Sequence, residues 1–126
     1  MKELSFDAAV IGGGAAGMAA ALEISGRGLS CAVIEREDGL GGILMQCIHN
    51  GFGLIEFNEE LSGPEFAQRF EDRLRAGNIR AFCGSTVIEI ENQGDAKVIS
   101  CVSSAQGVIR IRARAIVLAM GCRERN

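Results

Sequence analysis

The chain has 126 residues, of which 48% are hydrophobic and 23% charged, a composition that is typical of one globular domain and excludes a disordered segment. Its formal net charge is −3, and it contains six Phe but no Trp or Tyr. We expect no nucleic-acid partner, because such binding depends on clustered positive charge and aromatic stacking. The 17 glycines indicate places where the backbone approaches another group closely.

The cysteines follow no metal-binding or redox spacing. They are Cys31, Cys47, Cys83, Cys101 and Cys122, so no C-x-x-C pair occurs. We therefore expect no metal site, and free thiols favour a reducing, cytoplasmic location. The longest apolar stretch, residues 8–22, is shorter than the roughly 20 residues that span a bilayer, so no membrane partner is expected. A signal peptide is disfavoured, because two acidic residues precede this stretch and three glycines interrupt it.

The first third of the chain predicts a βαβ unit. Residues 5–11 form a short apolar run that is typical of a buried strand, and Gly12-Gly13-Gly14 predicts a sharp turn. An alanine-rich helix is expected over residues 15–25, and a second buried strand over residues 31–35. Strand, glycine turn, helix and strand in this order predict two parallel strands joined by a right-handed crossover.

The rest of the chain predicts a second helix and an antiparallel meander. Residues 36–63 form a long glycine-rich loop, and a helix is expected from Ser62-Gly63-Pro64-Glu65 to about residue 74. Turn residues separate three strand-like runs, and an apolar strand follows them; these lie at 79–90, 97–103, 107–113 and 115–119. The predicted fold class is α/β: a Rossmann-like fold with a central parallel sheet, covering helices and a three-stranded antiparallel meander, as one domain over 1–126.

Three arginines of the predicted meander alternate with apolar residues. Arg110, Arg112 and Arg114 are separated by single residues, so the period of two places them on one face of a strand. We expect this face to meet solvent or another protein segment rather than nucleic acid.

A glycine pattern follows the first strand and opens the first helix. Gly12-x-Gly14-x-x-Gly17 in this context is typical of dinucleotide binding. The first glycine permits the tight turn, the second lets the backbone approach a pyrophosphate, and the third lets helix and strand pack closely. The helix N-terminus would direct unpaired N–H groups at the ligand. Glu35, which ends the second strand, is placed to bind both hydroxyls of an adenosine ribose and to repel a 2′-phosphate.

Three further features favour FAD over NAD. Gly41-Gly42 offers a second close approach for an extended cofactor, the meander replaces a helical crossover, and Ala119-Met120-Gly121 ends the last strand near the first turn. A free-standing NAD-binding module without flavin is one alternative. The other is a cofactor-free, non-catalytic fragment that associates with a second copy of itself.

These segments together resemble the N-terminal FAD-binding segment of the two-dinucleotide-binding-domain flavoproteins, the pyridine nucleotide–disulfide oxidoreductase superfamily. The resemblance is carried by DAAVIGGGAAGMAAALEISGRGLSCAVIERE, GLGG, STVIEIE and AIVLAMGCRER, with Met120 in place of the usual Thr. GGILMQCIHNGFGL and EELSGPEFAQRF are similar to a branch of FAD-dependent oxidoreductases often encoded near glycerol-3-phosphate dehydrogenases. The resemblance implies FAD as cofactor, NAD(P)H as co-substrate, and hydride transfer between nicotinamide and flavin.

The resemblance also implies cofactor contacts for individual residues. The pyrophosphate would lie along Gly12, Gly14 and Gly17 and near the amides of Ala15 and Ala16. The remaining contacts would be made by Glu35 to the ribose, Arg36 and the backbone of Val87 to the adenine, Gly41 and Gly42 to the pyrophosphate and ribityl chain, and Ala119 and Gly121 to the cofactor from the last strand.

The chain departs from the superfamily in two respects. The positions of the family's redox disulfide hold Leu44 and His49, so no such disulfide is expected in this segment. Cys47 and His49 are the candidate catalytic residues, as a thiol near the flavin and a proton donor, although both also fit a structural role. The superfamily chain continues into an NAD(P)H-binding domain and then returns to complete the FAD domain. We therefore expect this chain to be part of a longer protein, inactive alone, whose partners are those domains or a second copy.

Overall fold

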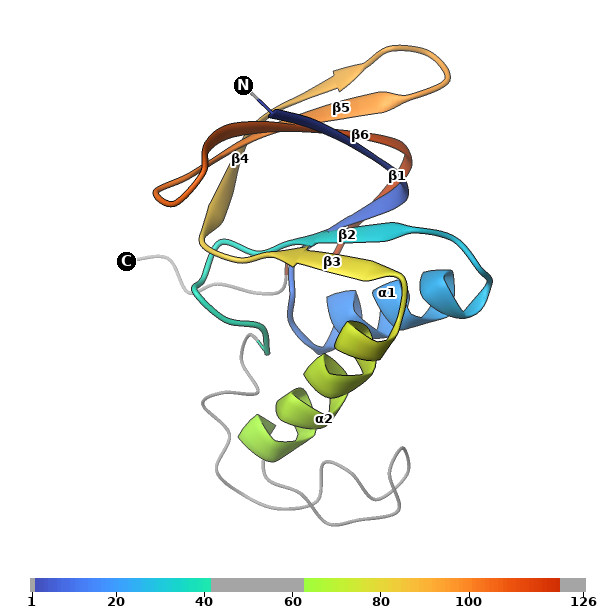
Figure 1. The fold of residues 1–126 in the computed structure, drawn as a ribbon, viewed down its shortest axis with the longest axis vertical. Coiled ribbons are helices and arrows are strands. Elements are labelled where there is room, and N and C mark those ends of the chain that lie inside the picture. Colours follow the sequence, from blue (N-terminus) through green and yellow to red (C-terminus); the bar gives the residue numbers. More distant parts are fainter. Residues whose placement is uncertain (1, 42–62, 121–126) are drawn as a thin grey trace.

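The computed structural model describes residues 2–41 and 63–120, which form a six-stranded mixed sheet and two helices (Figure 1). In chain order the elements are β1 (Lys2–Ile11), α1 (Ala15–Gly26), β2 (Cys31–Ile34), α2 (Gly63–Ala76), β3 (Ile79–Phe82), β4 (Ser85–Asn92), β5 (Lys97–Ser103) and β6 (Gly107–Leu118). The order across the sheet is β3-β2-β1-β6-β5-β4. The first four strands in this order run parallel, and β6, β5 and β4 form an antiparallel meander. The predicted fold class is confirmed.

Three strand limits predicted from the sequence are wrong. The run over residues 79–90 is two strands, because Gly84 turns the chain with a φ of +64°. Of these two strands, β3 extends the parallel sheet beside β2, and β4 belongs to the meander with β5 and β6. The runs over 107–113 and 115–119 are the single strand β6, because β1 pairs with it in one unbroken register. β1 accordingly begins at Lys2 rather than at residue 5.

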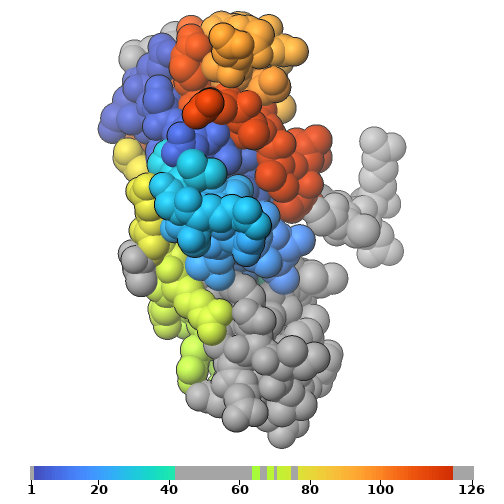
Figure 2. Space-filling view, turned by 90° about the vertical axis from the view of Figure 1, so that its right-hand side faces the viewer, coloured from blue at the N-terminus to red at the C-terminus, as the bar shows by residue number. Residues whose placement is uncertain are grey.

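β1, β2 and β3 lie between the two helices on one side and the meander on the other (Figure 1). Successive side chains of a strand point to opposite faces, so β1 and β2 supply both cores. The core toward the meander contains Ala9, Ile11, Ala32, Ile34, Phe82, Ile99, Cys101, Ile109, Ile111 and Ala113. The core toward the helices contains Val10, Met18, Ala21, Cys31, Val33, Leu40 and Leu74. The meander and α2 lie at opposite ends of the long axis (Figure 2).

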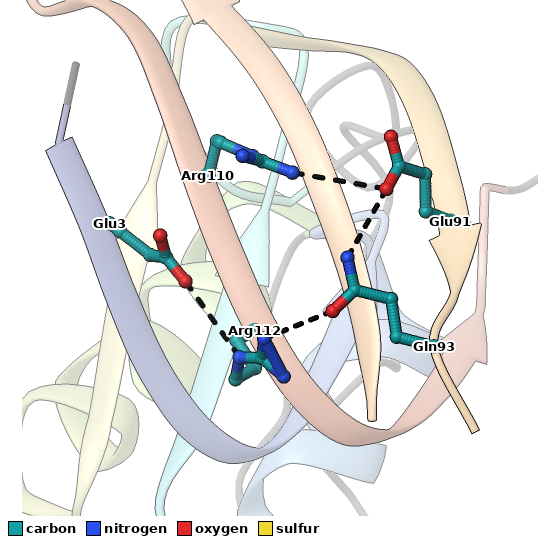
Figure 3. Close-up of polar contacts among 5 residues, drawn as sticks. All are labelled: Glu3, Glu91, Gln93, Arg110 and Arg112. Atoms are coloured by element: carbon teal, nitrogen blue, oxygen red, sulfur yellow. Dashed lines mark hydrogen bonds and ion pairs between the residues drawn. The ribbon is translucent and has the colours of Figure 1, made fainter. Parts of the chain in front are cut away.

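Arg110 and Arg112 of β6 lie on the outer face of the meander, where each has polar partners within the chain (Figure 3). Arg112 donates to Gln93 at 3.0 Å and lies 3.7 Å from Glu3 on β1, while Arg110 lies 3.9 Å from Glu91 on β4. Val98 of β5 is paired opposite Arg112 and is only 2% exposed. Because paired residues share a face, these long polar side chains cover apolar surface of the outer face.

Candidate functional site

The glycine turn between β1 and α1 is held tightly against its neighbours by backbone contacts. Gly12 has a φ of +113°, and a Cβ placed there would lie 2.0 Å from the carbonyl oxygen of Ala119. A Cβ on Gly17 would lie 1.8 Å from the carbonyl oxygen of Gly12. Backbone cannot yield as a flexible side chain can. The first glycine therefore allows the turn beside the end of β6, and the third allows α1 to pack on the end of β1.

Among the described residues, the N-terminus of α1 has no side-chain cap and no acidic residue in its first turn. Gly14 is the N-cap residue. The N–H of Met18 donates to the carbonyl of Gly14 at 2.9 Å as the first bond of the helix. The N–H groups of the preceding residues, including the exposed Ala15 and Ala16, have no partner within the helix. Such a terminus attracts an anion.

Glu35 follows β2 and directs its carboxylate at the glycine turn. Its Oε1 accepts a hydrogen bond from the N–H of Gly13 at 2.8 Å, and its Oε2 accepts one from the N–H of Glu37 at 2.7 Å. Its own backbone is paired with Phe82 and Ser85 at distances of 2.9 and 3.0 Å. The residue is only 9% exposed. The carboxylate therefore has a fixed position in the wall beside the turn.

A cavity of about 200 Å³ opens beside Glu35, at the carboxyl ends of β1 and β2. Its lining brings together four of the predicted site residues, Gly12, Glu35, Arg36 and Val87. It also includes five residues that the sequence did not single out for binding, Ile11, Ile34, Ser85, Thr86 and Met120. Crevices outside the carboxyl ends of parallel strands are where doubly wound folds bind ligands.

The segment after Glu35 returns to the same turn. The N–H of Gly41 donates to the carbonyl of Gly13 at 2.8 Å, and Gly41 forms an isolated parallel bridge with Gly14. Leu40 is buried, and its Cδ2 lies 2.4 Å from the position that a Cβ on Gly13 would occupy. The first and second glycine segments of the sequence therefore lie together.

The described residues bring most of the predicted site into one region. Gly14, Gly17, Gly41 and Ala119 adjoin the residues that line the cavity, whereas Gly42, Cys47, His49 and Gly121 lie outside the described residues. Ser85 and Thr86 immediately precede the predicted Val87 at the start of β4. Knowing that β4 begins at the cavity would have been enough to predict them.

Residues 2–41 and 63–120 contain neither a metal-binding cluster nor a membrane-spanning helix. No cluster of three or more potential metal ligands occurs in this part of the chain. None of its helices has the length and apolarity needed to cross a membrane.

Comparisons with known proteins place this geometry in a family. Residues 6–126 match the family model described as pyridine nucleotide-disulphide oxidoreductase. Hydrogen cyanide synthase subunit HcnB of Pseudomonas aeruginosa is 27% identical over 122 residues, which cover 93% of this chain and 25% of that protein. The chain therefore spans about a quarter of the length of this relative.

Two solved structures have the same fold over nearly all of the chain. L-Proline dehydrogenase from P. horikoshii has a TM-score of 0.85 and 26% identity, covering 99% of this chain and 24% of that one. A thioredoxin reductase from Streptococcus pyogenes has a TM-score of 0.77 and 28% identity, covering 97% of this chain and 37% of that one.

Proposed function

The chain belongs to the pyridine nucleotide–disulphide oxidoreductase family, and from this we propose that it is the FAD-binding part of an NAD(P)H-dependent flavoprotein oxidoreductase. It is a flavin-binding oxidoreductase module with a Rossmann-like fold, and FAD is its cofactor. When bound, the flavin would accept hydride from a reduced nicotinamide, and the protein would bind and orient the flavin.

The residues present fit the phosphate part of FAD. The Gly12-Gly13-Gly14 turn has no side chains, and the N-terminus of α1 has no side-chain cap, so its positive dipole end can meet a diphosphate. We assign the pyrophosphate to this turn, with Gly14, Ala15 and Ala16 donating through their N–H groups.

The cavity beside the turn fits the adenosine part. Each carboxylate oxygen of Glu35 already accepts one N–H and retains capacity for another bond, so the pair can accept both ribose hydroxyls. Arg36 and Val87 line the same cavity, where an adenine ring would lie beyond the ribose. A 2′-phosphate would meet the negative charge of Glu35, which disfavours NADP at this position. This convergence of Gly12, Glu35, Arg36 and Val87 on one cavity is the observation that carries the proposal.

Absorbance and titration test the proposal directly. Protein purified without heating should show flavin bands near roughly 370 and 450 nm, a property of the cofactor. Glu35→Ala should weaken FAD binding by on the order of 1–3 kcal/mol, because a charged acceptor is lost, and Gly14→Val should abolish binding. Glu23→Ala, an exposed position on α1, is the control and should bind as the unmutated protein does. Unchanged affinity in Glu35→Ala would remove this residue from the site.

A second candidate takes the electrons from an amino acid instead of NAD(P)H. It is favoured by the TM-score of 0.85 with L-proline dehydrogenase, against 0.77 with the thioredoxin reductase. Anaerobic mixing of the whole protein with NADH, NADPH or L-proline separates the two, since only a true reductant bleaches the flavin band near roughly 450 nm.

Several finer assignments stay predictions. Cys47 and His49 are proposed to lie near the flavin, and both are outside the described residues, as is most of the sequence that suggests the branch encoded near glycerol-3-phosphate dehydrogenases. We propose a cytoplasmic location, and we propose that the remaining domains of a longer protein complete the site.

A further inference from the structure

We propose that Glu35 positions the glycine turn for the diphosphate, in addition to its proposed contact with the ribose. This inference rests on the proposed function. Its basis is the buried hydrogen bond of 2.8 Å between the N–H of Gly13 and Oε1 of Glu35, which joins residues 22 positions apart. Gly13 lies between the first two glycines of the fingerprint. A hydrogen bond from its N–H therefore fixes the orientation of the backbone that the diphosphate would meet.

Within the part of the chain that the structure describes, three hydrogen bonds join the turn to other segments. The N–H of Gly12 donates to the carbonyl of Ile34 at 2.8 Å, and the carbonyl of Gly13 accepts from Gly41 at 2.8 Å. The third bond is the one from Gly13 to Glu35. It is the one made by a side chain, and therefore the one that a substitution can remove without altering the backbone.

Glu35 is itself held in place, which allows it to act as a support. Its Oε2 accepts from Glu37, and its backbone is bonded to both Phe82 and Ser85, which flank the corner between β3 and β4. Both partners of the carboxylate are N–H donors, so two acceptor oxygens are required. A glutamine at this position would accept one of these bonds and oppose a donor to the other.

The effect of removing the charge of Glu35 on diphosphate binding distinguishes a positioning role from ribose binding alone. A carboxylate close to a bound diphosphate repels it, so removing the charge should by itself strengthen the binding of a diphosphate that has no sugar. If Glu35 also positions the turn, removing it should instead weaken that binding, because Gly13 loses the bond that orients it. The two roles therefore predict opposite signs for the same measurement.

Calorimetric titration with two probes, inorganic pyrophosphate and ADP, tests the proposal on the whole protein. In Glu35→Ala we expect about tenfold weaker binding of pyrophosphate, as for a lost hydrogen bond to a charged group, and a larger loss for ADP. Glu35→Gln should lie between Glu35→Ala and the unmutated protein. The control Glu23→Gln removes the same charge from a side chain that is 70% exposed on α1 and should change neither affinity.

Amide hydrogen exchange at Gly13 without ligand gives a second readout, with circular dichroism to verify the fold. Exchange should be faster in both Glu35 variants and unchanged in Glu23→Gln. Equal or tighter pyrophosphate binding in Glu35→Ala, together with weaker ADP binding, would overturn the positioning role and leave the proposed function standing. If the unmutated protein binds neither ADP nor FAD, the proposed function fails and the inference fails with it. If it binds both, unchanged exchange at Gly13 in Glu35→Ala overturns the inference alone.

Discussion

The contact between α1 and β1 gives a sharp prediction for Gly17. The Cβ of an alanine at this position would lie 1.8 Å from the carbonyl oxygen of Gly12, 2.9 Å from its carbon and 3.3 Å from Cγ1 of Val10. Ordinary contacts begin at 3.4 Å. The helix would therefore have to withdraw by about 1.6 Å at this point, because the nearest atoms belong to backbone.

The energetic cost follows from what the helix buries there. Met18 and Ala21 of α1 are fully buried against the strands, and withdrawal loosens their packing. Overpacking of this kind costs about 1–3 kcal/mol, and a backbone neighbour places Gly17→Ala at the upper end. Alanine regains about 1 kcal/mol of helix propensity. We expect a net loss of about 2 kcal/mol in the free energy of unfolding.

Urea unfolding followed by circular dichroism measures this loss against a matched control. With a slope of about 1–3 kcal/mol per molar urea, the midpoint of Gly17→Ala should fall by about 1 M. Gly26 ends the same helix, and a Cβ there would meet nothing within 4 Å. Gly26→Ala should therefore be neutral or gain up to about 1 kcal/mol. Equal stability of the two variants would refute the close-packing role of Gly17.

Other predictions concern charge and thiol chemistry. Hydrogen bonds from Ser30 lower the pKa of Asp7 below its ordinary 3.8, so Asp7 stabilises the fold above about pH 4 and this contribution is lost as the pH falls through the lowered pKa. The melting temperature of Asp7→Asn should therefore be lower than that of the unmutated protein at pH 7, and the difference should shrink as the pH falls through the lowered pKa of Asp7. Burial raises the pKa of Cys31 to about 11, so iodoacetamide at pH 8 should label it only after unfolding, and labelling of the native protein would contradict its burial. Arg112→Ala should cost less than about 1 kcal/mol, because its ion pair with Glu3 is partly exposed; a larger loss in thermal unfolding would show that its stem covers more apolar surface than expected.

The βαβ unit of β1, α1 and β2 could be predicted because its local signals agree. Apolar runs, a glycine turn and an alanine-rich segment follow one another over residues 5–35, and each predicts one strand, turn or helix from local sequence alone. The meander strands were found, but their limits depend on pairing between distant segments. The length of β6 follows from its register with β1, which no local pattern of β6 contains.

The candidate site divides in the same way. Gly12, Gly17 and Glu35 were identified because a known chemistry requires those residue types at that spacing. Ile34, Thr86 and Met120 line the cavity because β2 and β6 end where β4 begins, and this meeting of distant segments cannot be seen in their residue types. The bond from Gly13 to Glu35 was also missed, since a backbone donor has no sequence signature.

The corner at Gly84 tests why the predicted run over residues 79–90 divides into β3 and β4. Its φ of +64° belongs to the left-handed region, and its N–H donates to the carbonyl of Glu37 at 2.7 Å, which ties the corner to the segment after Glu35. An alanine there should lower the free energy of unfolding by about 1–2 kcal/mol, because an L side chain is strained at this φ. A steric clash would not add to this cost, since the Cβ would meet only Asp38, at an ordinary 3.4 Å. Gly39 has open space and no left-handed φ, so Gly39→Ala should cost nothing. If thermal unfolding finds the two variants equally stable, the left-handed turn is not what ends β3, and the division must come from the pairing of β4 with β5.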